Sequence, residues 1–255
     1  MPATASTPPE TAARTRVAAL LTLGSIVSVQ AGAALATTIF DSIGSSGAVF
    51  LRALFGALAL LALTRGAPLR MREWRHRDVV LLGVSVAAVN LLFYAALERL
   101  PLGITVTLEF VGPLGVAVFG SRRWRDVIWV VLAAAGIVLL SDGSGEDVDP
   151  LGVALALAAG LFWAAYILQS ARVGRLGPGA GGATMAAVIS TVLVAPFGIA
   201  QGGGEILAPA VLAVGAAVGI LSTAVPYVAE MEALRRLPQA VFGVLMSLEP
   251  AVAAA

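Results

Sequence analysis

Apolar runs long enough to cross a bilayer recur along the chain and constrain its fold more than any other feature. A hydrocarbon core of about 30 Å needs about 20 helical residues. The sequence is 59% hydrophobic and 12% charged, far more apolar than a soluble domain. We therefore predict an all-α polytopic membrane protein. Its candidate spans are residues 17–40, 45–64, 79–97, 101–120, 127–140, 151–170, 182–200, 206–229 and 238–255.

The basic residues indicate how these spans are oriented. All 16 are arginine, and a cytoplasmic N-terminus puts fourteen of them on the cytoplasmic side, with Arg99 outside and Arg52 inside the second span. The segment 141–150, which would lie outside, is acidic. Excess arginine in cytoplasmic loops is the usual bias, so we predict a cytoplasmic N-terminus. Short loops of this kind anchor a protein at anionic lipid, so we expect contact with the bilayer and not with nucleic acid.

Missing residue types exclude several classes of function. The chain has no Cys, and His76 is its only histidine, which excludes disulfides, Cys-ligated metals and His-based triads. It has no lysine, so it cannot form the Gly-Lys-Ser/Thr loop that holds ATP phosphates. We expect no cofactor and no enzymatic activity. Residues 1–16 carry a Pro-, Thr- and Ala-rich start and are predicted to be a disordered cytoplasmic tail.

The chain contains an internal repeat with an offset of 137 residues. At this offset ALERLP (96–101) aligns with ALRRLP (233–238), and Pro113 aligns with Pro250. We predict two repeats, 17–140 and 151–255, joined by an acidic external linker at 141–150. Because five spans are an odd number, the second repeat is inverted, which is common in secondary transporters. The expected architecture is a ten-helix (5+5) inverted repeat, seen with nine helices because the sequence ends before the tenth.

Proline interrupts one predicted span in each repeat. Pro113 lacks an N–H, so the carbonyl of Glu109 loses its helical partner, and Pro250 does the same to Met246. Such irregular backbone is tolerated in a membrane only where protein buries it or where it lines a wet cavity. Broken spans at matching positions of two repeats are typical of a transporter's binding site.

Arg52 and Glu109 are charged residues within predicted spans. Counted from the outer ends of their spans, they lie about 10 and 12 Å deep, so we expect them to face each other or a shared cavity. They could form an ion pair that only locks two helices together. Alternatively, a zwitterionic amino acid binds with its carboxylate on Arg52, whose planar fork suits it, and its ammonium group on Glu109.

Several further residues are candidates for the same site. Glu249 precedes Pro250, and we predict that it carries or gates a proton; the alternative is a carboxylate satisfied by backbone donors at the broken helix. Polar residues within spans could line a cavity or only join two helices. Glu230 and Glu232 are expected to be solvated or paired with Arg235 and Arg236. The predicted substrate-binding set is Arg52, Asn90, Tyr94, Glu109, Gly112, Pro113, Tyr227 and Pro250.

Two segments resemble a known family. LGITVTLEFVGPLGVAVFGSRR (102–123) and FGVLMSLEPAVAA (242–254) are similar to the EamA-type branch of the drug/metabolite transporter superfamily, and within it to bacterial threonine/homoserine exporters. The resemblance extends over residues 17–255. It implies a secondary-active exporter of small amino acids or related metabolites, working by alternating access in the bacterial cytoplasmic membrane.

Other functions remain open at this stage. The cargo could be another small metabolite or a drug. An intramembrane enzyme would need a nucleophile–base pair or a metal cluster, and a scaffold would need a large domain outside the membrane. The expected partners are a small-molecule substrate, protons and the lipid bilayer. The sequence leaves the oligomeric state open, a homodimer included.

Overall fold

The described part of the chain is helical throughout. The computed structural model describes residues 8–66, 77–121, 149–173, 181–236, 245–246 and 248–253. Its elements, in order, are α1 (Pro8–Thr37), α2 (Phe40–Leu63), α3 (Arg77–Leu97), α4 (Leu102–Glu109), α5 (Val111–Ser121), α7 (Pro150–Val173), α8 (Gly181–Gly202), the 3₁₀ turn η4 (Gly203–Leu207), α9 (Pro209–Gly219), the π-helical turn η5 (Ile220–Ala224), α10 (Val225–Leu234) and α12 (Glu249–Ala253).

Several of these helices are long and apolar enough to cross a membrane. Six candidate spans are found in the described residues, with a shorter apolar helix at Leu102–Val116; the six are Thr15–Thr37, Phe40–Leu63, Arg77–Leu97, Pro150–Val173, Gly181–Leu207 and Pro209–Ala233. The predicted polytopic membrane protein is confirmed. The span at 127–140 lies outside the described residues, and the one at 238–255 is described only in part, so the ten-helix inverted repeat stays a prediction.

The start of the chain differs from the predicted tail. Residues 8–16 belong to α1, although we expected 1–16 to be disordered. Pro8 and Pro9 stand at the first positions of this helix, where the fixed proline φ suits a first turn and the missing N–H costs nothing. The apolar part of α1, from Thr15, then forms the first candidate span.

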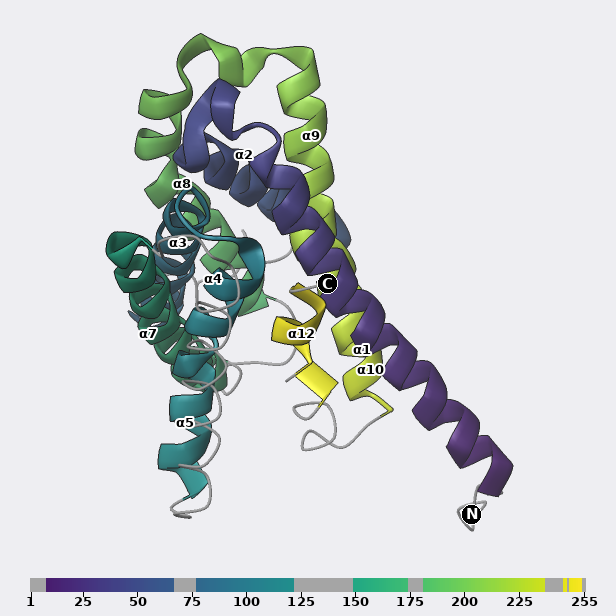
Figure 1. Ribbon diagram of the computed structural model, residues 1–255. Helices are drawn as coiled ribbons and strands as arrows, with labels where there is room; N and C mark the ends of the chain where they lie inside the picture. Colours follow the sequence, from purple (N-terminus) through teal and green to yellow (C-terminus); the bar gives the residue numbers. More distant parts are fainter. Residues whose placement is uncertain are drawn as a thin grey trace.

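Helices from the two halves of the sequence pack against each other (Figure 1). α1 runs alongside α9 and α10, α2 packs on α8 and α9, and α3 packs on α7 and α8. α4 contacts both α7 and α12. The main apolar core lies where these pairs meet and includes Ile43, Leu51 and Val218.

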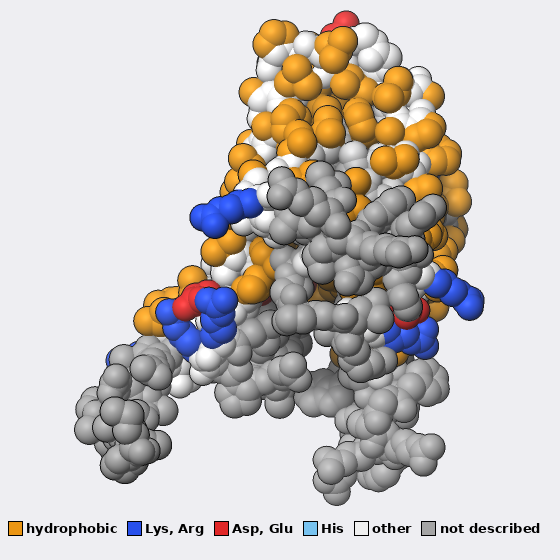
Figure 2. All heavy atoms as spheres, turned by 180° about the vertical axis from the view of Figure 1, so that it is seen from behind, with side chains coloured by type: hydrophobic (Ala, Val, Ile, Leu, Met, Phe, Trp, Pro, Cys, Tyr) orange, Lys and Arg blue, Asp and Glu red, His pale blue; other side chains and the backbone are white. Residues whose placement is uncertain are grey.

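The outer surface suits a lipid environment. Large apolar side chains point outward, among them Leu20, Leu161 and Val192, which are 69%, 72% and 67% exposed. Figure 2 shows hydrophobic side chains over the upper part of the molecule and most charged side chains toward the lower part, the end at which α1 begins in Figure 1. We call this lower part the arginine-rich end. Its described arginines include Arg16, near the start of the first candidate span, and, at or next to helix ends, Arg77, Arg172, Arg235 and Arg236.

A glycine bend near the start of α2 is held by side chains of other helices. Gly44 has φ +69°, a region that costs glycine little, and the predicted start of this span, Ser45, follows it. The Ser45 N–H donates to Glu98 Oε1 at 2.9 Å, and the Ser46 N–H donates to Gln201 Oε1 at 2.8 Å. These bonds satisfy N–H groups that a helix start leaves free, and they join α2 to the segments after α3 and at the end of α8.

A charged pair joins the same end of the molecule to α7. Arg99 Nη1 donates to Asp149 Oδ2 at 2.9 Å, and Asp149 Oδ1 accepts the Leu151 N–H at 2.9 Å. The hydrogen bond from Arg99, together with the backbone bond, lowers the pKa of Asp149. Asp149 thus caps the start of α7 as a carboxylate.

We expect Glu98→Ala to lower the free energy of unfolding by about 1 kcal/mol, because the Ser45 N–H loses its acceptor. Thermal unfolding of the purified protein in detergent measures the change. Glu205→Ala is the matched control, since Glu205 is an exposed acid on η4 with no side-chain role in capping α2. Equal melting temperatures for Glu98→Ala and the control would contradict the capping role.

Candidate functional site

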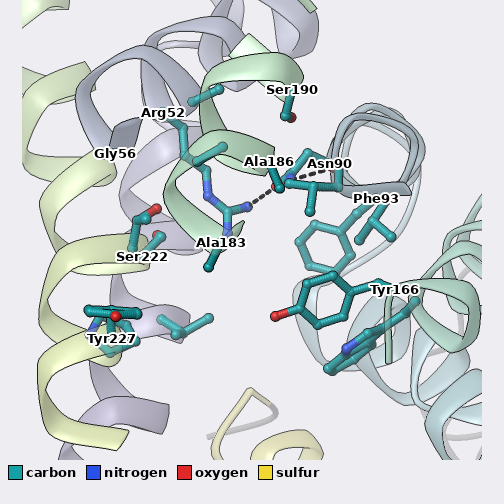
Figure 3. Close-up of a pocket in the computed structure, with 18 of the residues that line it drawn as sticks. Arg52, Gly56, Asn90, Phe93, Tyr166, Ala183, Ala186, Ser190, Ser222 and Tyr227 are labelled. Atoms are coloured by element: carbon teal, nitrogen blue, oxygen red, sulfur yellow. Dashed lines mark hydrogen bonds between the residues drawn. The ribbon is translucent and has the colours of Figure 1, made fainter. Parts of the chain in front are cut away.

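A cavity of about 450 Å³ lies between helices of the two halves. Its volume falls within the range of small-molecule sites, about 300–1,000 Å³. Figure 3 shows side chains from α2, α3, α7, α8, η5 and α10 converging on it. The polar and charged residues of its lining are Gln30, Arg52, Asn90, Glu109, Tyr166, Ser170, Ser190, Ser222, Thr223, Tyr227, Glu230 and Glu249.

The cavity occupies the half of the molecule nearer the arginine-rich end. Its lining reaches Leu60, three residues before α2 ends, and Ala183, two residues after α8 begins. Toward the opposite end, the rings of Phe40 and Phe93 pack on Tyr94, with centroids 5.9 and 5.8 Å from it, and Tyr94 is fully buried. We call Phe40, Phe93 and Tyr94 the aromatic cluster; of its three members, Phe93 also lines the cavity.

Arg52 is held in place by α3. Its Nη1 donates to Asn90 Oδ1 at 2.5 Å, and Asn90 Nδ2 donates to the Val86 carbonyl at 2.7 Å. The backbone bond fixes the Asn90 amide with its oxygen toward Arg52 (Figure 3). The guanidinium also lies over the Tyr94 ring, 5.5 Å from its centroid. Tyr94 therefore supports Arg52 from outside the cavity lining.

Glu109 lies at the break that the proline predicts. α4 ends at Glu109 and α5 begins at Val111. Glu109 is 7% exposed and lines the same cavity as Arg52, so the predicted shared cavity is present. The described residues show no ion pair within 4.0 Å between them; the Arg52 guanidinium attracts Glu109 across the cavity, and the Glu249 carboxylate repels it. Space for a ligand therefore remains between the charges.

Gly112 and Pro113 lie outside the cavity lining, at the break between α4 and α5. A Cβ on Gly112 would collide with the carbonyl of Gly160 on α7, and a Cβ on Gly160 would come 2.6 Å from the Glu109 carbonyl oxygen. The carbonyl that Pro113 leaves without a partner thus rests against Gly160. The sequence reasoning missed Gly160, because nothing local shows which helix approaches the break.

Glu249 reaches the cavity from α12. Its Oε1 accepts from Gln30 Nε2 at 3.1 Å, while Glu249 Oε2 and Gln30 Oε1 are buried without a hydrogen-bond partner among the described residues. Pro250 follows in the same helix. α12 packs against α4, so the two helices that carry Glu109 and Glu249 are neighbours.

A π-helical turn brings further polar groups to the site. Pro226 has no N–H for the Ser222 carbonyl, and the chain here forms η5 between α9 and α10. Ser222 and Tyr227 line the cavity (Figure 3). The hydroxyls of Ser222 and Ser190 are buried without a partner in the described part of the chain. Buried polar groups without partners are costly, which favours a site that receives polar ligands.

Glu230 is the main residue that sequence reasoning misplaced. Glu232 pairs with Arg235 at 3.1 Å and with Arg236 at 2.6 Å, as expected. Glu230 instead lines the cavity and accepts from Ser25 Oγ at 2.6 Å. Residues two apart on a helix face different sides, so the two acids could not share one environment.

The cavity is lined by charged side chains of both signs. One guanidinium and three carboxylates, those of Glu109, Glu230 and Glu249, face one cavity. No group of three or more His, Cys, Asp or Glu side chains within the described ranges is placed to hold a metal ion. Of the predicted residues, Arg52, Asn90, Glu109, Tyr227 and Glu249 line the cavity, and their roles in binding stay predictions.

Comparisons with known proteins agree on a group of transporters. The model of the EamA-like transporter family matches residues 150–255. The threonine/homoserine exporters RhtA of Escherichia coli K12 and Salmonella typhimurium SL1344 are 44% identical over 241 residues, covering 92% of this chain and 80% of each relative. The uncharacterized transporter YwfM of Bacillus subtilis is 28% identical over 207 residues, covering 78% of this chain and 70% of that protein. A crystal structure titled only "Crystal structure of protein" shares the fold, with TM-score 0.68, 20% identity, and 92% and 85% of the two chains covered.

We expect Gly160→Ala to lower the free energy of unfolding by about 2 kcal/mol, because the new methyl group collides with the Glu109 carbonyl. The melting temperature of the purified protein in detergent measures the loss. Gly24→Ala on α1 is the matched control, since a Cβ there meets nothing within 4 Å, and it should cost nothing. A Gly160→Ala protein as stable as Gly24→Ala would show that α7 does not hold the break.

Proposed function

From the premise that this chain belongs to the EamA-like transporter family, we propose that it exports small neutral amino acids such as threonine or homoserine across the bacterial cytoplasmic membrane. The family membership rests on the matched domain and on 44% identity to curated exporters over most of the chain. It is a multi-pass membrane transporter and not an enzyme. The substrate, the coupling and the orientation are the parts that we propose.

One observation carries the proposed substrate class. The Arg52 guanidinium and several carboxylates line one cavity, and among the described residues Arg52 forms no ion pair within 4.0 Å. Arg52, already held by Asn90, has donors left for a substrate carboxylate. Glu109 offers acceptors for an ammonium group. The unpartnered hydroxyls of Ser190 and Ser222 can meet the substrate hydroxyl. A zwitterion bearing a hydroxyl fits this set.

The proposed orientation places the cavity where an exporter loads. With the N-terminus in the cytoplasm, the arginine-rich end is cytoplasmic, and the cavity lies in that half of the molecule. Release to the outside requires the aromatic cluster to separate. Glycines at Gly198, Gly215 and Gly219 let α8 and α9 approach α2 closely, since a Cβ on each would press on Phe50, Leu51 or Phe55. Close small-residue contacts of this kind suit one bundle rocking against another.

Proton coupling is proposed at Glu249. Its carboxylate is repelled by that of Glu230 and attracted by Arg52, and one of its oxygens lacks a partner in the described residues. A proton on Glu249 and an ammonium group in the cavity would compete for the same negative charge. Such competition lets inward proton movement drive outward substrate movement.

Efflux of labelled threonine from loaded cells, with and without an uncoupler, tests the transport proposal. Export that the uncoupler abolishes is the expected result. No efflux of any amino acid in a broad screen would point to another metabolite or drug, or to a membrane protein that does not transport. Protein level in the membrane is measured in parallel.

We expect Arg52→Ala to weaken threonine binding about 100-fold, and Glu109→Gln to weaken it by a similar factor, because each leaves one substrate charge unpaired. Binding to the purified protein measures both. Arg172→Ala, an exposed arginine on α7 outside the cavity lining, is the control and should bind normally. Unchanged affinity in folded Arg52→Ala would exclude direct contact with the substrate.

We expect Glu249→Gln to remove the dependence of export on the proton gradient, because an amide cannot take up a proton. Vesicles with an imposed pH gradient measure threonine transport against its own gradient. Glu205→Gln, an exposed acid on η4, should remain fully coupled. Proton-driven efflux that persists in Glu249→Gln would refute the assignment.

A further inference from the structure

Of the three carboxylates that line the cavity, that of Glu230 has no role in the proposed function. We propose that Glu230 and Ser25 form a cation-binding position nearer the arginine-rich end than Arg52, and that it captures solutes bearing a primary ammonium group. This inference rests on the proposed export of amino acids. It extends that proposal by assigning the first residue that the substrate contacts.

The placement of Glu230 supports this position. Glu230 lies four residues before the end of α10, about 6 Å along the helix, whereas Arg52 lies about 16 Å from the corresponding end of α2. Pro226 and Tyr227, four and three residues earlier, line the same cavity, so this face of α10 points inward. A solute arriving from the arginine-rich end therefore reaches Glu230 before Arg52.

The partners of Glu230 leave its charge available. Ser25 Oγ donates at 2.6 Å, and this neutral donor is the only side-chain hydrogen bond that Glu230 makes within the described residues. The arginines that follow it, Arg235 and Arg236, are bound to Glu232. A carboxylate inside a membrane protein needs a compensating charge. Since no arginine of the described chain supplies one within 4.0 Å, a ligand cation fits.

Polar groups farther into the cavity can bind an ammonium group after Glu230 has bound it. Glu249 Oε2 and Gln30 Oε1 are buried, unpartnered in the described residues, and belong to side chains of the cavity lining. Glu230, Glu249, Glu109 and Arg52 all line this one cavity. An ammonium group moving inward thus passes from one carboxylate to the next until the substrate carboxylate meets Arg52.

The test is threonine transport by the purified protein in liposomes, with substrate supplied on the side of the arginine-rich end. Glu230→Gln should raise the KM for threonine about tenfold, because the substrate loses one charge-assisted hydrogen bond. The maximum rate should stay within about twofold of that of the unmodified protein. Glu230→Asp, which keeps the charge, should recover part of the affinity. Glu232→Gln is the matched control, two residues away on the same helix and bound to arginines, and should leave the KM unchanged.

The outcomes separate this inference from the proposed function. Saturable threonine transport with the same KM in Glu230→Gln as in the unmodified protein overturns the cation position alone. A fall in maximum rate with no change in KM, equal for the Gln and Asp variants, would mean that Glu230 only joins α1 to α10, and also overturns it. Absence of saturable transport of any amino acid by the unmodified protein overturns both.

If Glu230→Gln does not accumulate in the membrane, Ser25→Ala provides the second variant. It removes the hydroxyl that holds the carboxylate and should raise the KM about threefold, the effect of one neutral hydrogen bond. An unchanged KM in Ser25→Ala would then overturn the proposal.

Discussion

A charged side chain in the hydrocarbon region is stable only where protein surrounds it, and this constraint organises the molecule. Arg52, Glu109, Glu230 and Glu249 come from four different helices, and none faces the apolar outer surface. To enclose them, helices from the beginning of the chain pack between helices from its end. The lipid-facing side can then consist of apolar residues alone.

The helix break between α4 and α5 shows how backbone and side chain are arranged together. Pro113 removes the partner of one carbonyl, and Gly160 of α7 allows that carbonyl to pack without a clash. The same residue, Glu109, presents its carboxylate to the cavity. The break therefore directs the Glu109 carboxylate into the cavity, while α7 covers the irregular backbone.

Much of this arrangement could be predicted from local sequence. The apolar runs predict the spans, Ser45 predicts the helix start after Gly44, and Pro113 predicts the break at Glu109. Counting residues along two spans predicts that Arg52 and Glu109 share a cavity, and both line the one observed. These features depend on periodicity and on proline chemistry, which act within one segment.

Features that depend on neighbours in space could not be predicted. Nothing near Gly160 reveals that α4 ends against it, and the two arginines after Glu230 suggested a partner that Glu232 takes instead. The contacts of Tyr94 with Arg52 and of Gly112 with Gly160 could not be predicted for the same reason, since each partner belongs to another helix.

The π-helical turn η5 sets the rotation of everything that follows it in its span. A π turn accommodates one additional residue, and each residue of a helix turns by about 100°. Removing one residue from Ile220–Ala224 would turn Tyr227 and Glu230 about a quarter of a turn away from their present direction. A deletion there would bring Val228 to the place of Tyr227 and Met231 to the place of Glu230, and both of these apolar side chains are now exposed on the outer surface.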